Sequence, residues 1–142
     1  MSPRVHYVFP LFEEAFLERG FRLDFDENYR LTSSKIAPMP RQQMRPTPVV
    51  VNHQIFMIGG DQSRQNLVYD TMKNNWSWLP RIPVDHNLSC NVCVNYQDQA
   101  IFTFMLDGKF TIRSAVLPLE GLRLCDNPAE CQSDMDWVLE VP

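Results

Sequence analysis

The sequence predicts an all-β protein built from about three repeated units of four strands each. The first observation is a series of short β-prone apolar runs, such as residues 49–51 and 55–58, which are separated by polar residues typical of turns. The second is a similar ending, rich in proline and aliphatic residues, that closes at Pro40, Pro83 and Pro142. Recurrence of such landmarks indicates a repeat architecture.

The spacing of the landmarks sets the boundaries of the units. The endings lie 43 and 59 residues apart, and Phe25-Asp26 precedes Tyr69-Asp70 by 44 residues. Because repeats built from four strands have periods of roughly 40 to 50 residues, the longer interval predicts an insertion. We expect a degenerate first unit or N-terminal lead-in, a regular second unit and a third unit interrupted at about residues 118–136; these units cover residues 1–40, 41–83 and 84–142.

Residues 10–20 of the first unit predict a short amphipathic helix. Leu11, Phe12 and Phe16 recur at helical spacing, with a proline at the start of the segment and a glycine at its end. We expect the apolar face of this helix to pack on the first sheet, and binding to a partner is the alternative.

The second unit predicts two hairpins. Residues 49–51 and 55–58 are continuous apolar runs, so we expect a hairpin whose strands are buried on both faces. Gly59-Gly60 ends this hairpin, where glycine can take positive φ. Residues 61–66 contain no apolar side chain and predict a solvated loop. Strands at residues 67–69 and 76–79 follow, joined by a turn that begins at Asp70, with Trp76 and Trp78 on one face of the outer strand.

The third unit predicts the same order of strands with one interruption. Val92 and Val94 mark a first strand, and residues 101–106 mark a second. Asp107-Gly108 is typical of a tight turn and leads into a strand at residues 109–116. After the insertion, Trp137 opens the outer strand.

The second unit resembles a kelch repeat. Its apolar strand ends in Gly59-Gly60, is followed by Tyr69-Asp70 and then reaches Trp78 and Leu79 before a proline. The resemblance implies a partial kelch-type β-propeller of about three four-stranded blades, in which Trp137 matches Trp78. It also implies a protein-binding module, such as an adaptor, a ubiquitin-ligase substrate receptor or a cytoskeletal scaffold. We expect no enzyme activity, and an enzyme of the kelch-fold copper oxidase type is an alternative.

We expect a protein partner to be bound by loops between strands, because rigid strands tolerate changes in such loops. Arg64 is the main expected contact, since a guanidinium group can bind a carboxylate through two hydrogen bonds. A solvated Arg64 that binds nothing is the alternative. The residues expected to contact the partner are Asp61, Gln62, Ser63, Arg64 and Gln65 in one loop and Arg41 and Arg45 in the preceding one.

Three blades cannot close a propeller of the usual four to eight, so a flank of strands stays exposed at each end. The apolar faces of Trp78 and Trp137 would then lack a full set of neighbours. We therefore expect the chain to belong to a longer propeller, to pair with another propeller half or to form a homo-oligomer. A purely structural segment that completes a larger propeller is the alternative function.

The sequence gives less support for a metal site. Cys90 and Cys93 could bind zinc together with His86, Cys125 and Cys131, but residues three apart in a strand point to opposite faces. We expect buried or free thiols, no metal and no cofactor. Some kelch-fold proteins are copper oxidases, yet no matching set of tyrosine and histidine ligands can be placed here.

No catalytic residue is expected either. Asp24 and Asp26 could form a carboxylate pair, but they coincide with the Tyr-Asp landmark of the repeat, which favours a role in stabilising a turn. The net charge of −4, without a run of basic residues, argues against nucleic acid or an anionic membrane as a partner. The sequence has no apolar run long enough to span a membrane and no signal peptide, so a cytoplasmic location is expected.

Overall fold

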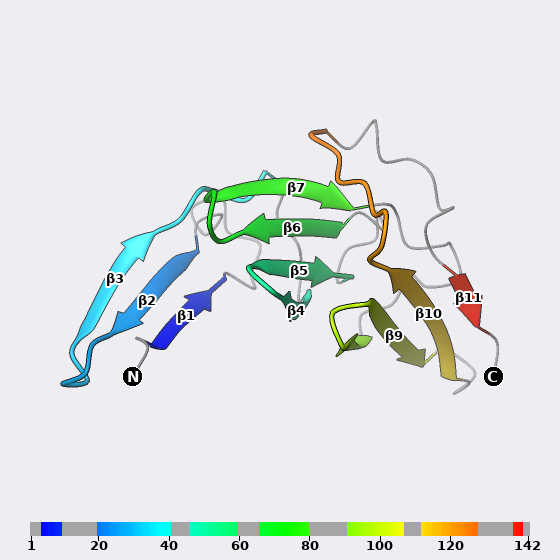
Figure 1. Cartoon of the computed structure of the whole chain (residues 1–142), viewed down its shortest axis with the longest axis horizontal. Coiled ribbons are helices and arrows are strands. Elements are labelled where there is room, and N and C mark those ends of the chain that lie inside the picture. The colour runs from blue at the N-terminus through cyan, green and yellow to red at the C-terminus, as the bar shows by residue number, and fades with distance from the viewer. Residues whose placement is uncertain are drawn as a thin grey trace. The chain divides into compact units, whose positions relative to one another are not determined.

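The computed structural model describes residues 4–9, 20–40, 46–59, 66–79, 91–106, 112–127 and 138–140 (Figure 1). In these residues the chain is all-β, as the sequence predicts, with three antiparallel sheets and no helix. The helix predicted at residues 10–20 lies outside the described residues, apart from Gly20. No helix in the described part is long and apolar enough to cross a membrane. The chain divides into two compact units, Met1–Gln42 and Gln43–Pro142.

The smaller unit holds a three-stranded sheet. Its strands are β1 (Arg4–Val8), β2 (Phe21–Phe25) and β3 (Leu31–Lys35), which pair in chain order. Gly20 directly precedes β2, and a Cβ atom at this position would lie 2.7 Å from the carbonyl oxygen of Val8. Only glycine therefore allows the end of β1 to approach the start of β2 this closely.

The first sheet of the larger unit has the four strands that the sequence predicts. These are β4 (Thr47–Val51), β5 (Gln54–Ile58), β6 (Asn66–Asp70) and β7 (Asn75–Leu79), paired in chain order. Apart from the half-buried first residue of β5, every residue of β5 and β6 is buried, whereas exposed and covered residues alternate along β4. The prediction of a hairpin buried on both faces is therefore right for β5 and wrong for β4, because β4 is an edge strand of its sheet.

The second sheet of the larger unit contains β8 (Asn91–Tyr96), β9 (Ala100–Leu106), β10 (Ile112–Pro118) and β11 (Val138–Glu140). The strands again follow chain order across the sheet, from β8 to β11. The tight turn predicted at residues 107–108 lies outside the described residues.

Asn66 contradicts the predicted solvated loop at residues 61–66. It is fully buried at the start of β6, and its Oδ1 accepts a hydrogen bond of 2.7 Å from the N–H of Gly59. Gly59 has a φ of 73°, the left-handed conformation that was expected of a glycine at the end of this strand. The polar side chain is buried because it satisfies a backbone group that would otherwise lack an acceptor.

β10 ends at Pro118, the residue at which the predicted insertion begins. The segment after β10 reaches back to the edge strand β7 (Figure 1). There, the N–H of Trp78 donates to the carbonyl oxygen of Cys125 at 2.8 Å, and the reverse bond is 2.9 Å long. Trp78 is only 6% exposed, so the expectation that it lacks neighbours is wrong. Trp137 lies outside the described residues.

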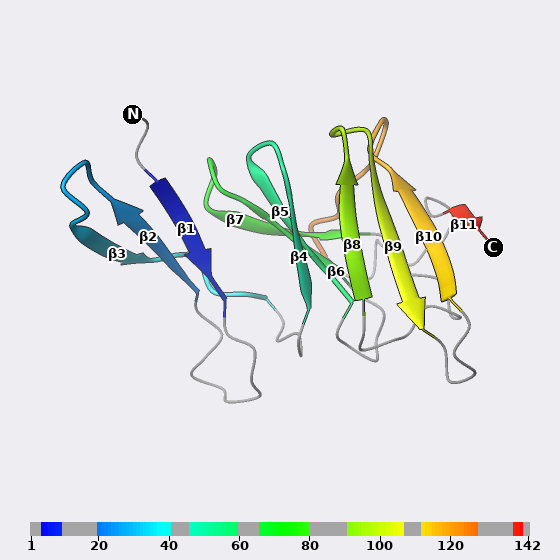
Figure 2. The same cartoon turned by 90° about the horizontal axis from the view of Figure 1, so that it is seen from below.

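The two sheets of the larger unit lie side by side (Figure 2). They share one hydrophobic core. The core holds side chains from the inner face of each sheet and fixes the position of one sheet against the other. Its buried residues are Val49, Val51, Phe56, Ile58, Val68 and Leu79 from the first sheet and Ile101, Ala115 and Leu117 from the second.

Candidate functional site

The predicted partner contacts all lie outside the described residues. They are Arg41, Arg45, Asp61, Gln62, Ser63, Arg64 and Gln65, and Gly60 and Trp137 of the kelch pattern are outside as well. The described turns of the larger unit gather at one end of its sheets, opposite the end where Gly59 and Asn66 lie (Figure 2). This arrangement follows from the antiparallel order, because consecutive connections alternate between the two ends. The end that carries these turns is the candidate site.

Tight turns shape this end of the larger unit. Left-handed backbone occurs at Asn52 with φ 53°, at Asn74 with φ 51°, and at Gln97 and Asp98 with φ 50° and 58°. Asparagine and aspartate tolerate this conformation better than most residues, and two-residue hairpin turns require it. The turns therefore hold their side chains in defined places.

Hydrogen bonds connect neighbouring strands and turns. The carbonyl oxygen of His53 accepts bonds from the backbone N–H of Thr71 at 3.0 Å and from its hydroxyl at 2.6 Å. The amide nitrogen of Asn95 donates to the carbonyl oxygen of Val50 at 2.9 Å and to the carboxylate of Asp98 at 2.8 Å. The bonds from Thr71 to His53 join two turns of the first sheet. The bond from Asn95 to Val50 joins β8 of the second sheet to β4 of the first.

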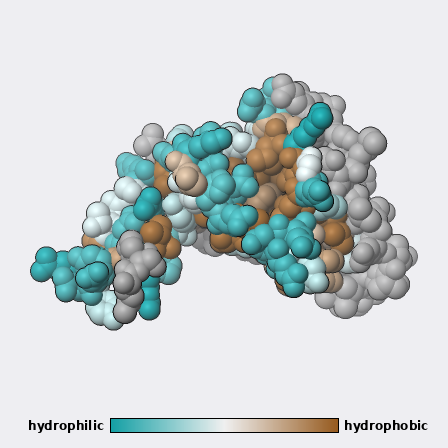
Figure 3. Space-filling model, in the orientation of Figure 1, coloured by the Kyte–Doolittle hydropathy of each residue, from teal (hydrophilic) through white to brown (hydrophobic). Residues whose placement is uncertain are grey.

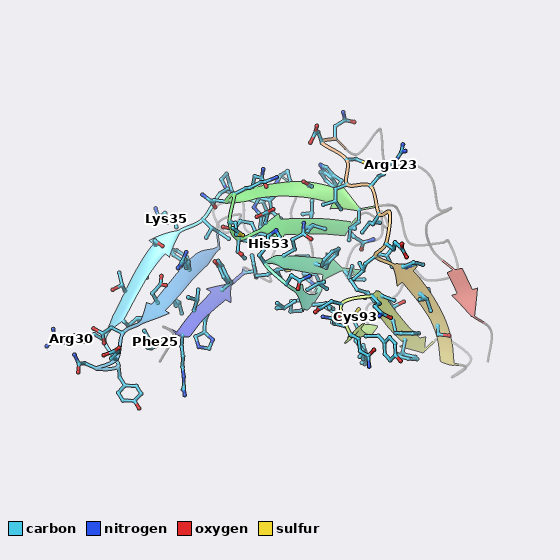
Figure 4. The ribbon with its side chains drawn as sticks, in the orientation of Figure 1. Phe25, Arg30, Lys35, His53, Cys93 and Arg123 are labelled. Carbon is cyan, nitrogen blue, oxygen red and sulfur yellow. The ribbon has the colours of Figure 1, made fainter. Side chains whose placement is uncertain are left out.

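Asp70 stabilises the turn between β6 and β7, as its place in the sequence pattern predicts. Its Oδ1 accepts bonds from the N–H groups of Met72 at 2.9 Å and Lys73 at 3.0 Å. Its Oδ2 lies 3.5 Å from Nε2 of His53, the residue that Figure 4 labels. Burial acts to raise the pKa of Asp70. The two N–H groups and the charges of His53 and Lys73 outweigh burial, so the pKa lies below its usual value.

Asp26 repeats this arrangement in the smaller unit. Its Oδ1 accepts bonds from the N–H groups of Asn28 at 2.8 Å and Arg30 at 2.9 Å. The predicted role in stabilising a turn is thus confirmed for Asp26. Asp24 instead forms an ion pair along β2, with its Oδ2 2.9 Å from Nε of Arg22.

A cavity of about 890 Å³ lies between the β4–β5 hairpin and the second sheet of the larger unit. Phe56, Phe102, Leu119 and Leu122 contribute apolar walls. Figure 3 shows hydrophobic surface gathered on one side of the larger unit, bordered by hydrophilic surface. The polar residues that line the cavity are Asn52, Gln54, Asp98, Gln99 and Glu120.

The charge of the cavity lining is negative. Asp98 and Glu120 are exposed carboxylates, and none of the described residues that line the cavity is a lysine, arginine or histidine. Tyr96 and Phe102 add aromatic rings on the side of the second sheet, with ring centroids 5.6 Å apart in an edge-to-face arrangement. The cavity can therefore hold an apolar group while its lining attracts a cation.

The cysteines show two different states. Burial raises the pKa of Cys93 to about 12, which makes this thiol a poor nucleophile and a poor metal ligand. Cys125 is disulfide-bonded, which corrects the expectation of four buried or free thiols. Among the described residues, no group of three or more His, Cys, Asp or Glu could hold a metal ion. Cys90, Cys131 and His86 of the zinc hypothesis lie outside those residues.

The residues that line the cavity are absent from the sequence-based site. Asp98 stands in a polar interval between two predicted strands, and Glu120 is followed by Gly121, whose φ is 74°. Each of these features could have been recognised as a turn. The sequence could not show that these two turns line one cavity, because their proximity depends on the packing of one sheet against the other.

Comparison with known proteins adds no family to this description. No protein-family model matches the chain, and no curated protein matches it. The geometry and chemistry of the site, together with the sequence pattern, therefore carry the functional argument.

Proposed function

We propose that the chain is a protein-binding module of the kelch-type β-propeller class and that its cavity receives a segment of the partner. The observation that carries this proposal is the cavity of about 890 Å³ with apolar walls and a few polar groups. Cavities of roughly 300 to 1,000 Å³ with this kind of lining are typical of ligand sites. Adaptor or substrate-receptor activity is the corresponding cellular role.

The repeated turn chemistry supports the propeller class. Asp26 and Asp70 are 44 residues apart in the sequence, and each accepts two backbone hydrogen bonds in the turn that follows its strand. In all three sheets the strands follow chain order, which is the arrangement within a propeller blade.

The lining of the cavity favours a partner segment in which a lysine or arginine stands beside a large apolar residue. The apolar residue would be covered by Phe56 and Leu122, and the basic residue would lie near Asp98 and Glu120. An acidic segment would meet two like charges and no described basic residue of the lining. Charge complementarity of this kind selects partners and speeds association more than it adds affinity.

The loops that contain Arg41 and Arg64 remain a second candidate surface. The strand ends that flank residues 60–65 lie opposite the cavity, so the two surfaces can be tested separately. The two surfaces also differ in charge: Arg64 in the loop would select acidic partners, whereas the carboxylates of the cavity lining favour basic ones.

A peptide array separates these possibilities. The purified chain would be applied to immobilised 12-residue peptides of random sequence, and bound peptides would be measured again in solution by fluorescence polarisation. We expect the bound peptides to be rich in lysine or arginine next to apolar residues. Leu124→Asp and Glu120→Lys, both in the cavity lining, should weaken binding tenfold or more.

Met72→Asp is the matched control, because Met72 is a 79% exposed apolar residue on a turn outside the cavity lining. It should leave binding unchanged. Binding that is lost when residues 61–65 are scrambled, but not in the cavity variants, would move the site to the loops. Absence of any bound peptide, together with no partner captured by the unaltered chain, would contradict the binding module itself.

A further inference from the structure

Part of the cavity wall is formed by the end of the second sheet that carries the turn between β8 and β9. Tyr96, Ala100 and Pro118 are paired in one row across β8, β9 and β10. Phe102 lies in the next row, on the same face, because side chains two residues apart in a strand share a face. All four residues line the cavity. The wall therefore contains an ordered group of side chains from three adjacent strands.

The rings of Tyr96 and Phe102 form a corner in this wall, which we name the aromatic corner. Their centroids are 5.6 Å apart, and their planes are inclined by 87°. Tyr96 is 50% exposed, so its ring is accessible from solvent. The face of an aromatic ring carries partial negative charge and attracts a cation within about 6 Å of its centroid. Two rings at nearly a right angle can therefore contact one cation from two sides.

Ala100 leaves space beside the aromatic corner. It is paired with Tyr96 in the second sheet, and Gln54 is paired with Val51 at the equivalent place in the first sheet. The two places are equivalent because each lies two residues before the phenylalanine of its repeat. The first sheet thus has a long side chain and an aliphatic one where the second sheet has a small side chain and a ring. The aromatic corner is consequently a feature of the second sheet.

Two exposed carboxylates line the same cavity. Glu120 belongs to the turn after β10, in which the N–H of Leu122 donates to the carbonyl oxygen of Leu119 at 3.2 Å. Asp98 belongs to the turn between β8 and β9, and its carboxylate accepts a bond of 2.8 Å from Asn95. Exposed carboxylates attract a cation to the cavity and stay hydrated themselves. The cation can then be covered by the rings without burial of an anion.

These surroundings favour a methylated cation over an unmodified ammonium group. A lysine ammonium has three N–H donors and is strongly hydrated, so it loses hydrogen bonds to water when it enters an apolar corner. A trimethylated ammonium has no N–H donor, and its methyl groups make apolar contacts with ring faces and with Pro118. Its positive charge is retained, so the rings and the carboxylates still attract it. The aromatic corner therefore matches a quaternary ammonium group.

We propose that the aromatic corner binds a trimethylated lysine of the partner segment. This lysine is the basic residue that the proposed function places near Asp98 and Glu120, so the inference rests on that function. The same quaternary ammonium chemistry occurs in free choline, and the experiment separates the two sources.

Tetramethylammonium tests the aromatic corner without any peptide. The full chain, isotope-labelled, is titrated with tetramethylammonium chloride, and NMR follows the amide signals of Tyr96, Ala100 and Phe102. We expect saturable shifts that ammonium chloride at the same concentration does not cause. Tyr96→Val and Ala100→Gln introduce the residues of the first sheet, and each should weaken binding about tenfold because a ring or the space beside it is lost. Tyr96→Phe is the matched control: it keeps the ring and should keep binding. Well-dispersed spectra verify that the variants are folded.

Peptides identify the source of the quaternary ammonium group. Every lysine-containing peptide of the array is paired with a copy in which the lysine is trimethylated, and bound pairs are measured in solution. We expect the trimethylated peptide to bind about tenfold more tightly than its unmodified copy, and more tightly than free choline. This advantage should disappear in Tyr96→Val.

The opposite results overturn the proposal. Array peptides that bind to a chain in which tetramethylammonium causes no saturable shift would exclude the aromatic corner and leave the proposed function intact. Equal affinity for the two copies of a peptide would show that its lysine does not enter the corner. Choline that binds as tightly as the trimethylated peptide would assign the corner to a small ligand. Tetramethylammonium binding by a chain that binds no peptide of either kind would contradict both the proposed function and the methylated partner.

Discussion

Asn66 and Gly59 show how one polar side chain secures the end of a hairpin. Asn66 is fully buried, and its Oδ1 is 2.7 Å from the backbone nitrogen of Gly59. Both residues are at the end of the sheet that faces away from the cavity. A polar residue at this position was predicted to be solvated because hydrophilic residues usually are. Asn66 is buried because the backbone N–H of Gly59 needs a hydrogen-bond acceptor. The polar run at residues 61–66 does not reveal this need.

Replacing Asn66 by alanine is expected to lower the free energy of unfolding by roughly 1 to 3 kcal/mol, because the N–H of Gly59 loses a buried acceptor. Asn95→Ala is the matched control. The amide of Asn95 is hydrogen-bonded in an exposed position, where water can replace its partners, and we expect a loss below about 0.5 kcal/mol. Urea denaturation of both variants makes the comparison, and equal losses would contradict the role of burial.

Asp70 makes stability depend on pH. Its pKa in the folded chain is below the ordinary value of 3.8, so the carboxylate stabilises the fold when the pH is above 3.8. This contribution is lost as the pH falls from 3.8 through the lower folded pKa, because the unfolded chain binds the proton first. We expect the difference in unfolding free energy between the wild type and Asp70→Asn to be largest near neutral pH and to shrink below 3.8. Urea denaturation over a pH series measures it, and a difference that is constant over the series would contradict this mechanism.

At the scale of elements, the strands were predictable because their signals are local. The strands at residues 55–58, 67–69 and 76–79 were predicted from apolar runs and turn residues, and β5, β6 and β7 contain them. The segment after β10 was predicted only as an insertion. Its bridge to β7 joins residues that are 47 apart in the sequence, and no local pattern specifies such a pairing.

The bridge between Trp78 and Cys125 should be weakened when disulfides are reduced. Cys125 is disulfide-bonded, and the bridge consists of only two backbone hydrogen bonds at this position. A cross-link restricts the ways in which a segment can detach, so its removal favours local opening. We expect the amide of Trp78 to exchange hydrogen faster after reduction, while the amide of Val68 in the centre of the sheet is unchanged. Hydrogen exchange followed by NMR measures both, and unchanged exchange at Trp78 would show that the disulfide does not support the bridge.

At the scale of the whole molecule, the two units differ in their cores. Every residue of the main core cluster belongs to Gln43–Pro142. In Met1–Gln42, all five residues of β3 are exposed. A single small sheet buries too little apolar surface to offset the entropy of folding.

We therefore expect a fragment of residues 43–142 to fold alone and to unfold cooperatively, whereas a fragment of residues 1–42 should stay unfolded. Circular dichroism and the dispersion of NMR amide signals test both fragments. A fragment of residues 43–142 without a cooperative transition would show that its core depends on the smaller unit.

The all-β class, the positions of the central strands and the turn role of Asp26 and Asp70 were predictable from the sequence alone. These properties depend on apolar runs, side-chain alternation and turn chemistry, which act over a few residues. The burial of Asn66, the bridge at Cys125 and the cavity beside Asp98 became visible in the folded chain alone. The bond from Gly59 to Asn66 crosses two strands of one sheet. The bridge and the cavity join segments more than 40 positions apart in the sequence, and no local pattern encodes such contacts.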